Sequence, residues 1–237
     1  MRPGAVALLA SLSLLTPAAA AASAPANRPR PLAARLADTG GGRQLITAEA
    51  PAARATTGTV TWWDRRHGHW TRAGSAVARF GANGLAEGAS RVQGTDTTPT
   101  GLYGLPFAFG TEAPPPGTTE PYRPVRRDSW WCQDNGSRSY NRWTQPLPAD
   151  CGAPDAEHLI TYPVQYAHAL VIGFNYDRPV RGRGAGIFLH VNGSGATAGC
   201  VSVPKEAMRR ILAWADPARA PHIAIGTTDG PTAITRY

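Results

Sequence analysis

Two residues near the carboxyl-terminal end of this 237-residue chain have types and a spacing that suit nucleophilic chemistry. His190 ends a short apolar run that is typical of a β-strand, and Cys200 precedes a second run that is rich in valine. A thiol has an ordinary pKa of about 8.5 and is mostly protonated at neutral pH, whereas only its thiolate attacks a carbonyl carbon well. A neighbouring imidazole can accept the thiol proton, so the pair is a candidate for acyl transfer through a thioester.

The loop between these two residues is made of small residues. Gly193, Gly195 and Gly199 permit positive φ angles and let a substrate approach the main chain closely. The amide of Gly199, with that of Cys200, is a candidate donor to an oxyanion, and such a donor contributes about 3 to 4 kcal/mol in acyl transfer. A glycine-rich turn beside a buried cysteine fits the same residues, and spacing alone leaves both interpretations open.

Residues 187–204, IFLHVNGSGATAGCVSVP, resemble the active-site motif of the L,D-transpeptidase catalytic domain, or YkuD-like domain. In that family of secreted bacterial cell-wall enzymes, a histidine that ends a strand precedes a Ser/Thr-x-Gly-Cys element. Here these positions are His190 and the run from Thr197 to Cys200. Two upstream segments resemble the family in the same order, TPTGLY at residues 98–103 and HALVIGFN at residues 168–175. Three ordered matches are much more specific than one, and they favour the catalytic interpretation.

The resemblance implies a mainly β fold, a YkuD-like β-sandwich or open barrel with a short helix after the strand of the catalytic cysteine. It also implies an L,D-transpeptidase that forms 3-3 cross-links between peptidoglycan stem peptides through a thioester on Cys200. His190 would act as general base and acid, the amide of Gly199 would bind the oxyanion, and no metal or organic cofactor would be needed. The alternatives are an L,D-carboxypeptidase or endopeptidase that hydrolyses stem peptides, and a non-catalytic cell-wall-binding module.

The sequence departs from the common family pattern beside the cysteine. Ala198 stands where the family often has histidine, and Ser202 stands where it often has arginine. Loss of the arginine bears on recognition of the donor peptide more than on the nucleophile. Thr197 and Ser202 remain candidate substrate-binding residues because of their motif positions.

The amino-terminal part of the chain has the composition of exported proteins. Residues 1–24 have the charged start, apolar run and alanine-rich tract of a secretory signal peptide, and the run is shorter than the ~20 apolar residues of a transmembrane helix. Residues 25–54 are rich in Pro, Ala and Arg and are predicted to be a linker, with one short element at 32–36 or 44–47. Residues 55–237 are predicted to form the catalytic domain.

The chain is basic, with a formal net charge of +8 that falls by one when Arg2 is lost with the signal peptide. A basic exported protein suits anionic wall polymers as a further partner, although a solvated basic surface explains the charge equally well. The arginines are scattered and form no nucleic-acid-binding motif. We therefore expect a secreted, cell-wall-associated monomer whose substrates are peptidoglycan stem peptides, with no nucleic-acid partner and no mature transmembrane segment.

The cysteine count predicts one disulfide. Cys132 and Cys151 lie on either side of a polar, turn-rich segment, and the third cysteine, Cys200, lies in the candidate site. A bond between Cys132 and Cys151 would stabilise the folded state by about 3 kcal/mol, because closing the loop between them lowers the entropy of the unfolded chain. It would make a stapled insertion of about residues 111–157 in the catalytic domain.

Further substrate-binding candidates lie in and after this insertion. Tyr140 and Trp143 alternate with polar residues and suit a cleft wall, although tryptophan in a β-rich domain more often packs in the core. Arg183 lies in a basic, glycine-containing loop and suits bidentate recognition of a stem-peptide carboxylate. A solvated surface loop explains this arginine equally well.

Short apolar runs separated by Gly, Asn and Pro predict the order of the secondary structure. A hairpin is expected around residues 64–68, and TPTG at 98–101 is expected to bend the chain into a strand over 102–109. Later strands are expected within 164–175, 186–190 and 222–226. An amphipathic helix is expected over 204–215, starting at a proline that suits the first helical turn.

Overall fold

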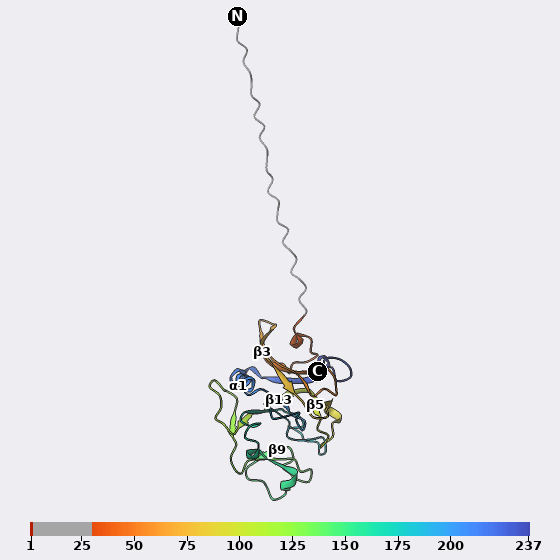
Figure 1. Cartoon of the computed structure of the whole chain (residues 1–237), viewed down its shortest axis with the longest axis vertical. Coiled ribbons are helices and arrows are strands. Elements are labelled where there is room, and N and C mark those ends of the chain that lie inside the picture. Colours follow the sequence, from red (N-terminus) through yellow and green to blue (C-terminus); the bar gives the residue numbers. More distant parts are fainter. Residues whose placement is uncertain (2–29) are drawn as a thin grey trace.

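The structure is a computed structural model that describes Met1 and residues 30–237 (Figure 1). Apart from Met1, the predicted signal peptide lies outside the described residues, and so does the start of the predicted linker. No helix within residues 30–237 is long and apolar enough to cross a membrane.

The fold is mainly β, with a large mixed sheet of eleven strands and a smaller antiparallel sheet of three strands. The large sheet has the order β4-β5-β14-β1-β2-β3-β13-β12-β11-β6-β7, and the small one β10-β8-β9. The strands are β1 (Gln44–Ala50), β2 (Thr57–Arg66), β3 (His69–Arg79), β4 (Leu85–Glu87), β5 (Thr98–Gly104), β6 (Ala108–Gly110), β7 (Tyr122–Pro124), β8 (Trp130–Cys132), β9 (Arg142–Thr144), β10 (Ala156–His158), β11 (Ala169–Val171), β12 (Phe188–Val191), β13 (Val201–Val203) and β14 (His222–Thr227). The helices are α1 (Lys205–Trp214) and the 3-10 turns η1 (Leu32–Ala34), η2 (Gly88–Ser90), η3 (Ala153–Asp155), η4 (Leu159–Thr161), η5 (Pro217–Arg219) and η6 (Ile234–Arg236).

The longest strand pair is the predicted hairpin of β2 and β3. The two strands pair antiparallel from Thr57 opposite Arg79 to Arg66 opposite His69. The two turn residues, His67 and Gly68, both have positive φ, at 48° and 80°. Positive φ at both central positions gives the turn the twist that flanking strands favour, so the hairpin prediction is confirmed.

One strand of the large sheet lies in the stretch predicted as a linker. β1 lies between β2, with which it pairs antiparallel, and β14, with which it pairs parallel. Leu45, Ile46 and Ala48 are fully buried. Because β1 is covered on both faces, its sequence QLITAEA lacks the alternation of a half-exposed strand. Short elements form at both places where one was expected, η1 (Leu32–Ala34) and β1. Because β1 is a central strand of the large sheet, the folded part of the chain begins before residue 55.

The segment TPTG does not form the predicted bend. It is part of β5, which pairs antiparallel with β14 and parallel with β4. Pro99 has no backbone N–H to donate to a neighbouring strand. It is tolerated near the start of β5, because the pairing with β14 begins only at Gly101. β5 ends at Gly104 and β6 begins at Ala108, so the single strand expected over 102–109 is two strands.

The helix α1 follows the cysteine-bearing strand as predicted. Its apolar stripe of Ala207, Met208, Ile211 and Leu212 is buried in the main hydrophobic core, which also includes side chains of β12 and β13. The mainly β class with one short helix after β13 is thus confirmed.

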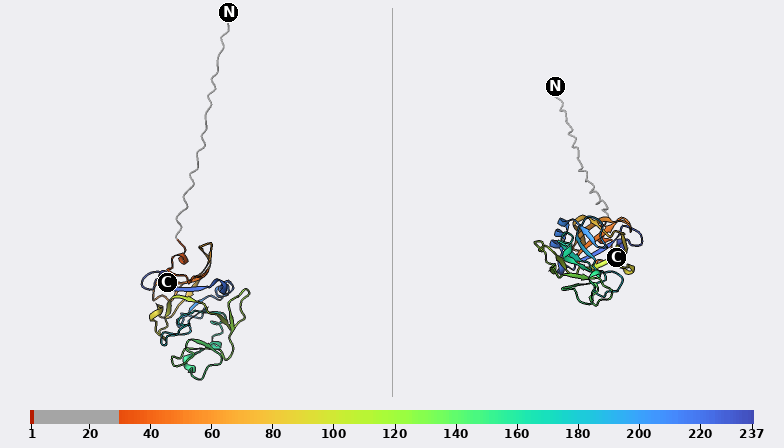
Figure 2. Two further views of the ribbon diagram at one scale, coloured as in Figure 1. Left: turned by 180° about the vertical axis from the view of Figure 1, so that it is seen from behind. Right: turned by 60° about the horizontal axis from the view of Figure 1, so that its bottom comes forward.

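The small sheet and its loops form the predicted insertion. Figures 1 and 2 show it at the end of the molecule away from the β2–β3 hairpin. It packs on the large sheet through an aromatic cluster in which Trp131 and Phe109 contact the ring of Phe188 edge-on. The strand β12 therefore has a hydrophobic cluster on each side.

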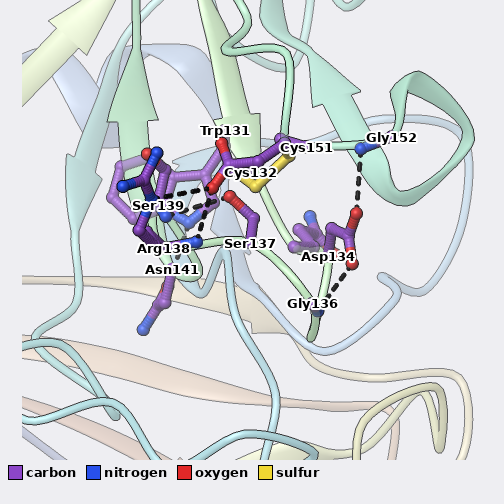
Figure 3. Close-up of a disulfide and its surroundings, with 12 residues drawn as sticks. Trp131, Cys132, Asp134, Gly136, Ser137, Arg138, Ser139, Asn141, Cys151 and Gly152 are labelled. Carbon is purple, nitrogen blue, oxygen red and sulfur yellow. Dashed lines mark hydrogen bonds and ion pairs between the residues drawn. A yellow bond between two sulfur atoms is a disulfide. The ribbon is translucent and has the colours of Figure 1, made fainter.

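A disulfide joins Cys132, the last residue of β8, to Cys151 (Figure 3). The Asp134 carboxylate accepts hydrogen bonds from the amides of Gly136, at 2.7 Å, and Gly152, at 2.9 Å, which ties the turn after β8 to the segment after Cys151. This is the predicted pairing, and it leaves the Cys200 thiol free and buried.

Candidate active site

The strands β12 and β13 bring the candidate nucleophile and base into one cavity. They pair in parallel, with Leu189 opposite Val201 and His190 opposite Ser202. Cys200 is thereby level with Phe188, which is two residues from His190 and on the same face of β12. Cys200 and His190 both line a cavity of about 580 Å³, together with the loop at residues 193–198.

Two threonines hold the backbone of Cys200, and each comes from one of the short motifs. The Cys200 carbonyl accepts hydrogen bonds from Thr197 Oγ1, at 2.7 Å, and from Thr98 Oγ1, at 3.2 Å. Thr98 Oγ1 also accepts the amide of Gly81, at 2.8 Å. The motifs TAGC and TPTG are far apart in the sequence but meet at one carbonyl oxygen, which uses both of its lone pairs.

The Cys200 thiol is buried in the aromatic cluster and is 8 % exposed. Its sulfur accepts the amide of Phe188, at 3.3 Å, and donates to the carbonyl of Gly186, at 3.4 Å. Burial raises the pKa of the thiol to about 12, with a smaller upward contribution from Glu157 and a downward one from Arg91. The resting thiol is therefore protonated at neutral pH.

The His190 ring is oriented by its own strand. Its Nδ1 lies 2.8 Å from the carbonyl oxygen of Val191. A carbonyl only accepts, so Nδ1 carries the proton and Nε2 has the free lone pair. Burial lowers the pKa of His190 to about 4, and the Tyr166 ring packs edge-on against the imidazole with a centroid distance of 5.5 Å. The resting imidazole is neutral and can act as a base.

Gly199 occupies a position that no other residue fits. Its φ is 128°, and a Cβ there would lie 2.9 Å from both Nη2 of Arg91 and the carbonyl oxygen of Thr97. Its amide, the predicted oxyanion donor, donates to Thr197 Oγ1 at 3.1 Å. In this resting arrangement that donor is engaged within the loop.

A buried guanidinium lies behind this loop. Arg91 is 6 % exposed and donates to the carbonyls of Thr97, at 2.7 Å, and Arg183, at 3.1 Å. Within residues 30–237 it has no carboxylate in ion-pair contact. A positive charge here favours a thiolate on Cys200. The sequence offered no signal for Arg91, which lies outside the three motifs.

Of the five residues predicted to bind substrate, only Thr197 lines the cavity, and Ser202, Arg183, Tyr140 and Trp143 do not. Ser202 is fully buried on β13 and donates to Asn192 Oδ1 at 2.8 Å. Arg183 contributes its carbonyl to Arg91 and does not line the cavity.

The two aromatic candidates pack against other residues of the protein, Tyr140 in the interior and Trp143 half-buried at the aromatic cluster. Tyr140 is 3 % exposed, donates to Gln93 Oε1 at 2.8 Å and accepts the amide of Gly184 at 3.0 Å. Trp143 packs edge-on against Phe107 and Phe109. Neither side chain lines the cavity.

Several cavity residues were not predicted. They include Gln133 and Glu157 of the insertion and Tyr162, Gln165 and Tyr166 before β11. Nothing in their local sequence marks them, because the small sheet brings Glu157 to the cavity and the pairing of the Gln165 carbonyl with the Val191 amide brings the segment before β11 there. Among residues 30–237 no group of three or more His, Cys, Asp or Glu side chains is placed to hold a metal ion.

A match to a known protein family agrees with the motif arrangement. Residues 53–232 match the family described as YkuD, the L,D-transpeptidase catalytic domain. No curated protein sequence matches the chain. Among solved structures it is similar to Bd1075 of Bdellovibrio bacteriovorus, with 16% identity and a TM-score of 0.37 over 78% of this chain and 48% of that chain. The chain spans about half the length of that protein.

Proposed function

This chain belongs to the family of L,D-transpeptidase catalytic domains, and from that premise we propose that it is an exported L,D-transpeptidase with Cys200 as nucleophile. Membership implies an enzyme of the cell wall that acts on peptidoglycan stem peptides. The observation that supports Cys200 best is that it lines the same cavity as His190, whose ring has an unprotonated Nε2.

The first half of the proposed reaction forms a thioester. His190 Nε2 takes the thiol proton as the sulfur attacks the carbonyl carbon of an L,D-peptide bond in the donor stem. The negative charge on the carbonyl oxygen is stabilised by main-chain amides at the start of β13, which requires the Gly199 amide to turn from Thr197 to the substrate. The imidazolium then protonates the departing amine, and the donor acyl group remains on sulfur.

The second half transfers the acyl group. An amine of a second stem attacks the thioester carbon, His190 takes a proton from that amine, and the sulfur leaves as a thiolate that is reprotonated. The product is a 3-3 cross-link. Because the resting thiol and imidazole are both neutral, the charges arise only as the substrate reacts.

Export is the setting that this chemistry needs. A disulfide between Cys132 and Cys151 fits an oxidising compartment outside the cytoplasm. The basic charge of the chain suits contact with anionic wall polymers after secretion.

Mass spectrometry of the purified protein with a disaccharide-tetrapeptide tests the proposal, with Cys200→Ala as the control. Dimers that lack one terminal D-alanine, formed only when Cys200 is present, are the expected result. Tripeptide monomers without dimers would assign the protein to the hydrolases instead. Absence of both a product and an acyl-enzyme adduct would contradict catalysis and favour a wall-binding module.

A further inference from the structure

The disulfide-closed insertion contributes part of the cavity wall, and that part is acidic. Asp155 and Glu157 line the cavity and come from η3 and β10 of the insertion. Apart from His190, they are the only ionisable carboxyl or basic side chains among the described residues that line it, and no lysine or arginine does. The cavity lining therefore has a negative charge, although the whole chain has a net charge of +8.

Glu157 is held in place by two neutral donors. Its Oε1 accepts the hydroxyl of Tyr166 at 2.5 Å, and its Oε2 accepts the side-chain amide of Gln133 at 3.3 Å. β10 pairs with β8 so that Glu157 lies opposite Trp131, which fixes the backbone from which the carboxyl projects. Its place is thus determined by the small sheet.

The carboxyl of Glu157 has no cationic partner within residues 30–237. Burial raises its pKa to about 7, and the hydrogen bond from Tyr166 offsets this only in part. A half-buried carboxylate without a counter-ion is costly. A cation that enters the cavity from outside would stabilise its ionised form.

We propose that Glu157 is a specificity-determining residue that binds the ammonium group of the acyl acceptor beside the Cys200 thioester. This inference rests on the proposed function, because only acyl transfer to an amine brings a primary amine to this sulfur. A primary amine of lysine type has a pKa of about 10.4 and arrives protonated at neutral pH. It must enter the cavity that holds the thioester, and there it meets carboxylates and no competing cation.

The consequence is a preference for transfer over hydrolysis. Water, the competing nucleophile, carries no charge and gains nothing from Glu157. Holding the amine near the thioester raises its effective concentration there. The bound ammonium gives one proton to solvent before its nitrogen attacks, and His190 takes the second proton as the C–N bond forms and the C–S bond breaks. Removal of the charge should therefore lower transfer while leaving thioester formation and hydrolysis in place.

Glu157 could also affect the reaction indirectly, through Tyr166 and His190, and the experiment must distinguish this effect from binding of the ammonium group. Tyr166, its hydrogen-bond donor, packs edge-on against His190. If Glu157 acted by positioning Tyr166, its loss would slow thioester formation and would lower transfer and hydrolysis together. Tyr166→Phe removes the same hydrogen bond but keeps the carboxylate.

The experiment compares the wild-type chain with Glu157→Gln, Tyr166→Phe and the control Glu206→Gln, which changes an exposed carboxylate on α1. Intact-protein mass spectrometry follows the thioester, and product analysis gives the ratio of cross-linked dimer to hydrolysed tripeptide. We expect Glu157→Gln to form the thioester at least as fast as the wild type, because loss of the charge removes one contribution that raises the pKa of Cys200. The ratio should be about tenfold lower, as for loss of one charge-assisted hydrogen bond. Glu206→Gln should keep the wild-type ratio, and Tyr166→Phe, which keeps the carboxylate but removes one of its two donors, should lower the ratio by less than Glu157→Gln does.

The salt dependence of the ratio is a second, independent measurement. Raising the ionic strength from about 0.05 M to 0.5 M screens an ammonium-carboxylate attraction, so the ratio should fall in the wild type and stay constant in Glu157→Gln. Normal thioester formation with an unchanged ratio in Glu157→Gln would overturn the inference. So would an equal loss of transfer and hydrolysis that Tyr166→Phe reproduces. Absence of any thioester in the wild type would instead overturn the proposed function, and this inference with it.

Discussion

The resting Cys200 thiol should be unusually slow to alkylate. Cys132 and Cys151 are joined, so Cys200 is the one thiol that a reagent can reach in the oxidised protein. Burial raises its pKa from 9.0 to about 12. At pH 7 the thiolate fraction therefore falls from about 1 in 100 to about 1 in 100,000, and because the thiolate is the reactive form, the rate should fall about 1000-fold.

The assay is the reaction with iodoacetamide, followed by intact mass in native buffer and in urea with the disulfide kept oxidised. In urea the rate should rise with pH and level off near pH 9. In native buffer it should be about 1000-fold lower at pH 7 and rise about tenfold per pH unit with no plateau below pH 10, since the folded thiol deprotonates later.

Rapid native alkylation with a plateau near or below neutral pH would refute the reasoning. If His190→Ala abolished that plateau, the resting protein would contain a thiolate-imidazolium pair and not two neutral groups. The expected slow reaction has a practical consequence. Low reactivity toward a thiol probe does not identify this protein as a non-catalytic module, and acylation by a substrate peptide is the informative test.

Three further predictions concern the parts that hold the site. Gly199→Ala places a Cβ 2.9 Å from a buried guanidinium at a φ of 128°, so it should lower the free energy of unfolding by about 1 to 3 kcal/mol in urea titrations and abolish thioester formation. Thr98→Val leaves the Gly81 amide without its acceptor and should cost about 1 to 3 kcal/mol, whereas Thr71→Val on the exposed hairpin should change the same titration by less than about 0.5 kcal/mol. Removing the disulfide by Cys132→Ser with Cys151→Ser should cost about 3 kcal/mol; an unchanged thermal midpoint would show that the insertion does not need it.

Local sequence was sufficient for the features that depend on neighbours in the chain. The strand that carries His190, the turn of the β2–β3 hairpin and the amphipathic stripe of α1 follow from periodicity and from residues with special backbone preferences. The disulfide followed from cysteine arithmetic, because the third cysteine lay in a motif. The motif order also indicated the family, since three short elements in one order are rarely coincidental.

Sequence reasoning failed where burial on two faces removes the periodic signal. β1 is central in the sheet, but a strand covered on both sides carries no alternation, so only a short element at 44–47 within a linker was expected. TPTG contains the residues of a turn, yet pairing of its first three residues with β4 and of Gly101 with β14 holds it extended. In both cases tertiary pairing overrides local preference.

The sequence by itself determined which groups can do the chemistry, and the tertiary structure decided their state and surroundings. The types and spacing of His190 and Cys200 identify them as candidates, but that both are neutral at rest follows from their burial beside aromatic side chains. Glu157 reaches that cavity from an insertion distant in sequence, and Ser202, beside the nucleophile in sequence, points into the sheet. The physical reason is that desolvation and charge proximity depend on contacts between distant segments, which spacing along the chain does not encode.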